Sequence, residues 1–286
     1  MLGGGYGALL DAVRGVHWPA RQPVSSATAG AHHAKTRGTS AEFTEYRPYR
    51  QGDDPRRIDW RLLARSDRAY IRLATDRAIL PTMILLDTSA SMAFPALTRA
   101  KWTVAQQIAI GLAAVAHGDG DPAGVALHDA RGSLRVLAPR TRRGVVNEMA
   151  SIIDGADPDG MEPLGPALAS LRSARLIVIT DLLGDCDELL RAARAHIAGG
   201  REVHLAHIVA EEELEPPRRL VLAADPEAPG YQRLLNERTR RDYQRAFGDW
   251  RRDRAREWRS AGANYVEVIT NELPGHAVRR IAGSAS

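Results

Sequence analysis

Cysteine and long apolar runs are scarce in this sequence, and each scarcity excludes a class of protein. The single cysteine, Cys186, cannot form an intrachain disulfide, so the chain does not resemble a disulfide-stapled secreted domain. No apolar run reaches the ~18–20 residues that span a bilayer. The N-terminus also lacks a basic head followed by an apolar block. The sequence therefore predicts a cytoplasmic protein without a membrane segment or a signal peptide.

Lysine is almost absent, and this shapes how the positive charge is interpreted. Of 39 basic residues only Lys35 and Lys101 are lysines, and the net charge is +4. The excess lies mainly in 231–259, where ten arginines alternate with five acidic residues. Interspersed acids are more typical of a solvated helix face than of a phosphate-binding track. We expect no nucleic-acid partner, and we keep binding through this arginine-rich stretch as an alternative, which predicts retention on DNA with a steep salt dependence.

Short apolar runs alternate with longer helical patterns from residue 79 onward. Strands are predicted at 82–87, 123–128, 133–138, 175–180, 202–208 and 264–269, and helices at 99–117, 143–154, 163–172, 185–198 and 231–260. Continuous apolar strands interleaved with helices favour an α/β fold whose mostly parallel sheet is covered on both faces. The run 133–138 follows 123–128 after a short turn, so these two strands are expected to form an antiparallel edge hairpin.

Three segments are expected along the chain. Residues 1–40 are predicted to be a flexible and partly helical N-terminal extension, with Ser, Ala and Gly enriched over 23–40. Residues 41–78 form a second segment, rich in charge and turn residues, that is expected to pack on the main domain. Residues 79–286 form the α/β domain with its long helix 231–260. The aromatic and apolar residues of that helix recur near the helical period, which indicates core packing.

Asp-x-Ser-x-Ser follows the first predicted strand, as Asp87, Ser89 and Ser91 in "DTSASM". A helix cap is one interpretation, since Asp and Ser are preferred cap residues. A divalent-metal site is the other. Ligands of open parallel sheets bind beyond the carboxyl ends of the strands, where Asp87 and Asp181 of "VITD" both lie. Mg²⁺ and Mn²⁺ prefer such oxygen ligands, whereas zinc prefers His and Cys.

The same residues resemble a known site, and an upstream segment resembles a known family. "DTSASM" with "ITD" is similar to the metal-ion-dependent adhesion site of von Willebrand factor A domains. Residues 41–73 and the closing stretch 262–270 resemble bacterial domain-of-unknown-function family 58. The matching core of the upstream segment is Arg47, Pro48, Tyr49, Gly52, Asp53, Asp54, Arg56, Arg57, Ile58, Asp59 and Trp60. The resemblance covers roughly 8–282 and implies a von Willebrand factor A-like, Rossmann-like fold.

The resemblance also implies a ligand set for Mg²⁺ or Mn²⁺. Asp87, Ser89 and Ser91 correspond to the first ligands, and Asp181 to the strand-terminal acid that usually acts through water. A threonine usually completes such a site, but Glu162 stands at its place in 158–168. Either Glu162 ligates the cation directly, or it points to solvent and the site is degenerate. Three converging carboxylates would be costly without a cation, so their convergence would favour a metal.

The signature segment 41–73 has two interpretations of its own. Gly52, Asp53, Asp54, Arg56, Arg57 and Asp59 either form a local ion-pair network or contact a partner directly. Exposed ion pairs contribute only ~0–1 kcal/mol each, so this cluster would be a poor device for stability alone. Trp60 is expected to be an anchor buried against the main domain.

No phosphate-binding loop, nucleophile elbow or His-Glu-x-x-His motif occurs in the sequence. We therefore expect a non-enzymatic, metal-dependent protein-interaction module. The family resemblance implies an adaptor or co-chaperone for a MoxR-type AAA+ ATPase, acting with an unknown client protein in the maturation of protein complexes. A Mg²⁺-dependent hydrolase using Asp87 and Asp181 remains an alternative, which a phosphatase or nuclease screen would test.

Overall fold

The structure is a computed structural model that describes residues 5–21, 42–51, 53, 55–75, 79–218, 221–224 and 232–283. Two compact units make up the chain. Unit 1 comprises residues 1–22 and 80–286, and unit 2 comprises residues 23–79. The candidate metal residues belong to unit 1, and the signature residues belong to unit 2.

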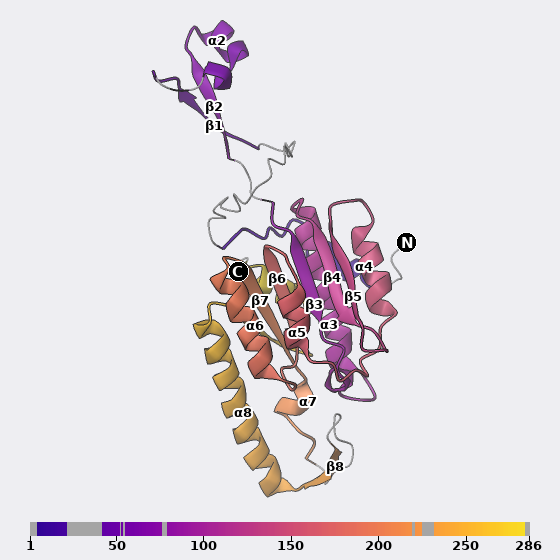
Figure 1. The fold of residues 1–286 in the computed structure, drawn as a ribbon. Helices are drawn as coiled ribbons and strands as arrows, with labels where there is room; N and C mark the ends of the chain where they lie inside the picture. The colour runs from indigo at the N-terminus through magenta and orange to yellow at the C-terminus, as the bar shows by residue number, and fades with distance from the viewer. Residues whose placement is uncertain are drawn as a thin grey trace. The chain divides into compact units, whose positions relative to one another are not determined.

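Unit 1 is built on a six-stranded sheet in the order β10-β7-β6-β3-β4-β5 (Figure 1). The strands are β3 (Thr82–Leu86), β4 (Ala123–His128), β5 (Leu134–Arg140), β6 (Arg175–Thr180), β7 (Glu202–Val209) and β10 (Asn264–Ile269). All neighbours pair in parallel except β4 and β5, which form the predicted antiparallel hairpin. Chain order therefore reverses between β3 and β6, and this switch point is where doubly wound sheets bind ligands.

Helices cover both faces of this sheet, as Figure 1 shows. The helices are α1 (Gly7–Ala12), α3 (Ala100–Gly118), α4 (Val145–Asp154), α5 (Leu164–Ser170), α6 (Cys186–Ala198), α7 (Glu211–Leu214), α8 (Glu237–Ser260) and α9 (Pro274–Ala282). Ile84 and Leu86 of β3 face the core under α1, α3, α4 and α9, whereas Met83 and Leu85 face the core under α5, α6 and α8. The predicted α/β class with a mostly parallel, doubly covered sheet is confirmed.

The helix predicted over 231–260 begins later than expected. Residues Gln232–Leu235 form β9, which pairs antiparallel with β8 (Val221–Ala224), and α8 starts after Asn236. The Asn236 side chain accepts a hydrogen bond from the Thr239 backbone amide, and the Thr239 hydroxyl oxygen accepts one from the Asn236 backbone amide. This reciprocal cap fixes the helix start at a place where apolar periodicity alone gives no signal.

The aromatic residues of α8 pack less deeply than the predicted core stripe. Trp258 is fully buried, while Tyr243, Phe247 and Trp250 are half-buried. The rings of Tyr243 and Phe247 stack with centroids 5.5 Å apart, and Phe247 stacks on Trp250 at the same spacing. Residue Tyr231 lies outside the described residues.

The N-terminal extension is described only over residues 5–21, and 22–40 lie outside the described residues. Leu9, Val13 and Trp18 of the described part are buried in unit 1. The Arg175 guanidinium stacks over the Trp18 ring at 4.4 Å and donates to the Trp18 carbonyl at 3.1 Å. These contacts attach the described part of the extension to the α/β unit. Among the described residues, no helix has both the length and the apolar character to cross a bilayer.

Unit 2 consists of two antiparallel strands, β1 (Glu42–Pro48) and β2 (Tyr70–Thr75), with η1 (Pro55–Arg57) and α2 (Trp60–Ser66) between them. Asp59 caps α2 by accepting from the amides of Arg61 and Leu62 at 3.0 Å. Asp53 pairs with Arg47 at 2.8 Å and accepts from the Arg50 amide, which together hold the pKa of its carboxyl below the usual range. Part of the signature segment thus organises its own turn.

Other signature residues are less fully described. Gly52, Asp54 and the side chain of Arg57 lie outside the described residues, and the Arg56 side chain is exposed. The Trp60 side chain is 62% exposed. Its role as an anchor against the main domain, and the packing of residues 41–78 on that domain, remain predictions.

Candidate functional site

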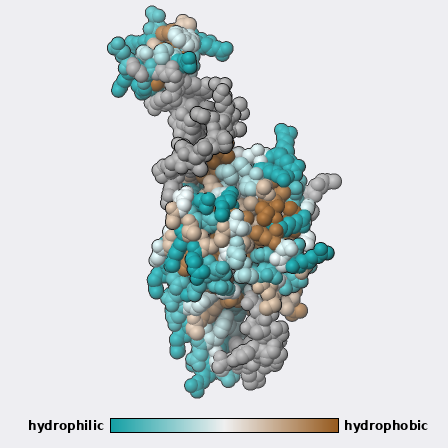
Figure 2. Space-filling model, viewed as in Figure 1, coloured by the Kyte–Doolittle hydropathy of each residue, from teal (hydrophilic) through white to brown (hydrophobic). Residues whose placement is uncertain are grey.

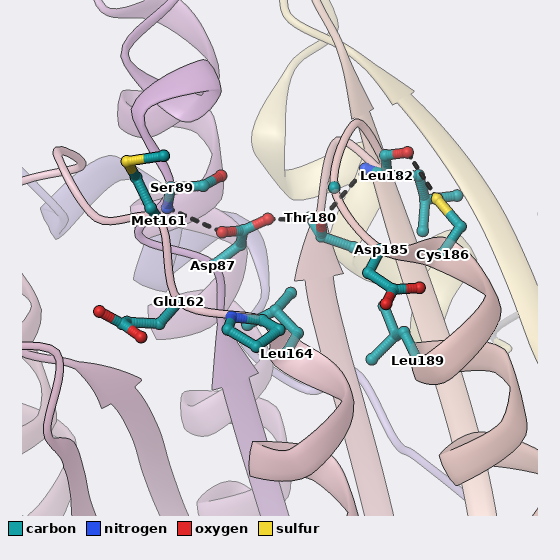
Figure 3. A pocket seen from close by; sticks show the side chains of 12 residues that line it. Asp87, Ser89, Met161, Glu162, Leu164, Thr180, Leu182, Asp185, Cys186 and Leu189 are labelled. Atoms are coloured by element: carbon teal, nitrogen blue, oxygen red, sulfur yellow. Dashed lines mark hydrogen bonds between the residues drawn. The ribbon is translucent and has the colours of Figure 1, made fainter. Parts of the chain in front are cut away.

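Strand β3 carries Asp87 to the carboxyl edge of the sheet, directly at the switch point. The residues of β3 are all buried, and the Asp87 amide continues the pairing by donating to the Ile179 carbonyl of β6 at 3.0 Å. The carboxylate lies between two donors (Figure 3). It accepts from the Ser89 amide at 2.8 Å and from the Thr180 hydroxyl at 2.5 Å. A buried carboxylate is thus fixed by the ends of two neighbouring strands.

The Asp87 carboxyl has a strongly perturbed acidity. Burial, and next the negative charge of Asp181, raise its pKa to about 6. The hydrogen bonds from Thr180 and Ser89 act in the opposite direction but do not cancel the burial. Among the described residues no arginine, lysine or histidine forms an ion pair with Asp87. A bound cation would supply the missing compensation.

Ser89 and Ser91 lie on the loop and short helix η2 (Ala90–Ala93) that follow Asp87. Their hydroxyl oxygens are 3.0 Å apart, and Ser91 is buried. Ser89 occupies the cap position of η2 without a side-chain capping bond, and the cap of α3 is Arg99. These serines therefore do not cap a helix through their side chains. The bond from the Ser89 amide to Asp87 is a local turn contact.

Asp181 follows β6 and is buried, but its carboxylate is already balanced by a lysine. The Lys101 ammonium, in the first turn of α3, lies 2.9 Å from Asp181 Oδ2 and 2.6 Å from Glu213 Oε1 of α7. Lys101 is fully buried. Burial disfavours its charged form, but the charges of Asp181 and Glu213 outweigh burial and hold the Lys101 pKa above its usual value. The sequence did not predict this triad.

The His207 side chain hydrogen-bonds the backbone of Asp181. The Asp181 carbonyl can only accept, so His207 Nε2 donates to it at 3.1 Å and His207 Nδ1 accepts from the Tyr265 hydroxyl at 2.6 Å. Burial lowers the pKa of His207 to about 3, so the ring is neutral. The next residue, Leu182, has a φ of 59°, a left-handed conformation that is uncommon for a branched side chain.

Glu162 is not brought to Asp87. Two backbone hydrogen bonds join the loop 155–163 to the Asp87 loop. The Gly160 amide donates to the Thr88 carbonyl, and the Gly160 carbonyl accepts from the Ala90 amide. The Glu162 carboxylate nevertheless points away from Asp87 (Figure 3) and lies against Gly132 of the β4–β5 turn. A Cβ atom at Gly132 would come within 2.4 Å of Glu162 Oε1. In this arrangement of the described residues the Glu162 carboxylate does not face Asp87, and its ligation of a cation stays a prediction.

Of the predicted metal residues, Asp87, Ser89 and Glu162 line one pocket at the carboxyl edge, which we call the switch-point pocket, and Ser91 and Asp181 are not among its lining residues. It is lined by Asp87, Ser89, Met161, Glu162, Pro163, Leu164, Thr180, Leu182, Gly184, Asp185, Cys186 and Leu189. Burial raises the pKa of the Cys186 thiol to about 11, so Cys186 is not a thiolate ligand at neutral pH. Ser89 and Ser91 bond each other, and no histidine among the described residues hydrogen-bonds either hydroxyl. Neither serine is therefore paired with a histidine base, whereas the Thr180 hydroxyl donates to the Asp87 carboxylate.

The donor set is suited to a hard cation that keeps several waters. Asp87 supplies an uncompensated carboxylate, and Ser89 and Ser91 supply hydroxyl oxygens. Within the described part of the chain, no group of three or more His, Cys, Asp or Glu side chains is arranged to hold a metal. A cation at Asp87 would thus depend on the serines and on water, as Mg²⁺ commonly does. Asp181 would act through water, because Lys101 occupies one of its oxygens.

Several arginines of the arginine-rich helix α8 pair with acids of the same helix. Arg241, Arg252 and Arg256 pair with Glu237, Asp249 and Asp253, and Arg245 lies 4.0 Å from Asp242. Arg240 donates to the Arg218 carbonyl at 2.7 Å. The surface over α8 is hydrophilic in Figure 2. This pairing within the helix agrees with a solvated face, as the interspersed acids predicted.

Comparison with known proteins places the chain among uncharacterized relatives. It is 28% identical over 273 residues to uncharacterized proteins of Mycobacterium bovis and Mycobacterium tuberculosis, covering 92% of this chain and 85% of each relative. Among solved structures, an aerotolerance-related membrane protein from Bacteroides fragilis aligns with a TM-score of 0.46 at 17% identity. The alignment covers 71% of this chain and 96% of that one. BatB from Bacteroides thetaiotaomicron aligns with a TM-score of 0.45 at 17% identity, over 71% and 97%.

One family model matches residues 45–253, which include most of the signature segment, the Asp87 loop and Asp181. The match begins near Arg47 and ends within α8. It spans both units, so the signature segment and the switch-point pocket occur within one family pattern. The chain belongs to the family described as protein of unknown function DUF58.

Proposed function

We propose that this protein is a non-enzymatic interaction module that binds partner proteins at the carboxyl edge of its sheet, with Mg²⁺ or Mn²⁺ at Asp87. The observation that carries the proposal is the Asp87 carboxylate, buried at the switch point and without an ion-pair partner among the described residues. Ser89 and Ser91 add oxygens beside it. A cation bound there would offset the cost of burial and could complete its shell with a partner's oxygen.

The partner we propose is a MoxR-type AAA+ ATPase, with this protein as its adaptor toward a client. Family membership supports this, because the signature segment 41–73 resembles proteins that work beside such ATPases. An interaction role is supported over catalysis because the Ser89 and Ser91 hydroxyls lie within hydrogen-bond distance of each other, and no histidine among the described residues bonds either of them. A cytoplasmic location follows from the proposed partner.

A pull-down with the cognate ATPase tests this proposal. Wild-type protein should retain the ATPase in Mg²⁺ buffer and lose it in chelator, and Asp87→Ala should fail to retain it in either buffer. Arg14→Ala is a suitable control, because Arg14 is exposed and pairs only locally with Asp11 at 2.7 Å. Binding that survives both the chelator and Asp87→Ala would remove the metal from the mechanism, and failure of wild type to bind would remove the ATPase.

A further inference from the structure

The loops at the carboxyl edge of the sheet combine exposed apolar side chains with strong negative charge. We call this surface the carboxyl-edge face and define it as residues 87–99, 129–133, 155–163, 181–187, 210–215 and 270–273, all of which follow strand ends or join them. Leu97 is 100% exposed, Met161 76%, Leu273 66% and Leu183 42%. The described part of unit 1 has one other exposed large hydrophobic residue, Val136 on strand β5.

Single exposed hydrophobic residues are ordinary on a protein surface, but gathering on one face is not. Leu97 and Met161 lie on neighbouring loops, because Arg99 of one loop pairs with Asp157 of the other at 2.8 Å. Met161 also lines the switch-point pocket, and Leu183 lines an adjoining groove with Trp250 and Arg254. Methionine side chains are adaptable and common on surfaces that bind proteins. Met161 and Leu183 therefore lie at the pocket and its adjoining groove, and Leu97 lies on the loop next to that of Met161.

The charge of this face is opposite in sign to that of the whole chain. Its residues include thirteen acidic side chains and two arginines, Arg99 and Arg131, although the chain as a whole carries +4. Eight of the acids are exposed: Asp157, Asp159, Glu162, Asp185, Asp187, Glu211, Glu212 and Glu215. Arg99 is already paired with Asp157. Lys101 and Arg254, outside the face, pair with Asp181 and Asp187, but most of the exposed acids have no such ion pair among the described residues. Positive charge on a partner that docks here is therefore favoured.

We propose that the carboxyl-edge face binds a partner protein through a surface that combines lysine or arginine with apolar side chains. The apolar groups of the partner contact Leu97, Met161, Leu183 and Leu273, and its basic groups neutralise the surrounding acids. This inference rests on the proposed interaction function and names the partner's chemistry.

Two synthetic peptides test the chemistry without the ATPase. Both are helical, about 14 residues long, and place leucines on one face; the other face carries lysine in one and glutamate in the other. Each is titrated into the full-length protein with and without Mg²⁺, and methyl NMR signals are followed. The lysine peptide should shift the signals of Leu97, Met161, Leu183 and Leu273, and the glutamate peptide should not. Affinity should fall as salt rises from about 50 to about 300 mM.

Variants of the full-length protein complete the test. The double variant Met161→Ser/Leu183→Ser should bind the lysine peptide about tenfold more weakly, as expected when two central apolar contacts are lost. Val136→Ser, which removes an exposed apolar group outside the face, should bind like wild type. Equal binding of both peptides, signal shifts elsewhere, or unchanged affinity of the double variant would overturn the inference. So would self-association of the protein that the double variant abolishes, because a second copy would then cover the face.

The peptide result and the ATPase result can be told apart. If the lysine peptide binds the face but the ATPase is not retained, the inference stands and the ATPase assignment is lost. If the ATPase binds and Met161→Ser/Leu183→Ser leaves that binding and the peptide binding unchanged, the module binds its partner through another surface.

Discussion

At the scale of single residues, Asp87 is a buried acid whose surroundings oppose its charge. Its pKa rises from 3.8 to about 6, so the folded protein holds a proton that the unfolded chain releases between these values. The stability contributed by this group is therefore complete below about pH 4 and is lost as the pH rises through 6. The rise corresponds to about 3 kcal/mol, at ~1.4 kcal/mol for each pKa unit.

Asp87→Asn should remove this pH dependence. In chelator, the free energy of unfolding of wild type relative to Asp87→Asn should fall by about 3 kcal/mol between pH 4 and pH 7. Urea unfolding followed by circular dichroism measures this difference at each pH. Asp11→Asn serves as control, because Asp11 is an exposed acid paired with Arg14. A difference between wild type and Asp87→Asn that does not change with pH would show that Asp87 titrates normally.

Lys101 is a second residue whose substitution should change the stability of the fold. Its ammonium is fully buried between Asp181 and Glu213. Lys101→Met should leave two carboxylates without their cation and lower the free energy of unfolding by about 3–5 kcal/mol. Adding Asp181→Asn and Glu213→Gln to Lys101→Met should recover much of this loss, because no charge is then left buried alone. If the triple variant is as unstable as Lys101→Met, lost packing and not charge explains the effect.

Some residues of this site can be predicted from the sequence, and others cannot. Asp87, Ser89 and Ser91 are predictable because one short motif carries them, and Asp181 because it ends an apolar strand. Lys101 contacts groups 80 and 112 residues away, and Thr180 bonds Asp87 across 93 residues, so no local pattern reveals them. The sole advance signal is that Lys101 is one of two lysines in the chain and opens an apolar helix.

At the scale of elements, the inner strands of the central sheet were predicted well because they are buried on both faces. A strand such as β6, in which every residue is buried, reads as an unbroken apolar run. The start of α8 was missed because its boundary depends on the Asn236 cap. The helix α9 was not predicted, although its first turn begins with Pro274, a favoured first helical residue.

Among the elements, the N-terminal segment 5–21 makes the contribution to stability that is easiest to test. Trp18 is 1% exposed and lies between the Arg175 guanidinium and the His204 ring, with ring centroids 5.1 Å apart in the latter contact. Trp18→Ala should lower the free energy of unfolding by about 3–5 kcal/mol, as for other large-to-small core changes. Urea unfolding measures the loss. Arg14→Ala on the same segment should change the free energy of unfolding by less than about 0.5 kcal/mol. If Trp18→Ala has an equally small effect, the N-terminal segment 5–21 does not contribute to stability through Trp18.

At the scale of the whole molecule, the protein consists of an α/β unit with an acidic, partly apolar carboxyl edge and a separate signature unit. The bulk composition predicts the α/β unit but conceals the acidic edge, because the arginines elsewhere give the chain a positive net charge. Acids enter this edge from six loops spread between Asp87 and Glu272, so only the sheet topology brings them together. The proposed partner surface and the proposed cation site thus lie at the same edge of the sheet.

Cation binding should appear as a stabilisation of the whole molecule. A cation that binds only the folded protein raises its stability by RT ln(1 + [L]/Kd), which is about 2.7 kcal/mol at a concentration of 100 Kd. Each kcal/mol raises the midpoint of thermal unfolding by about 2–4 °C in a protein of this size. Differential scanning calorimetry of wild type should therefore show a higher midpoint in Mg²⁺ or Mn²⁺ than in EDTA, and the shift should vanish in Asp87→Ala.

Glu162→Ala makes this calorimetric experiment specific for the ligand set. The Glu162 carboxylate lies against Gly132 and points away from Asp87, so its removal should leave the cation-dependent shift in place. Loss of the shift in Glu162→Ala would mean that the loop 155–163 brings this carboxylate to the cation on binding, as the family resemblance allows. An equal shift in Asp87→Ala and wild type would place the cation elsewhere in the molecule, and no shift in any of the proteins would require the partner to complete the site.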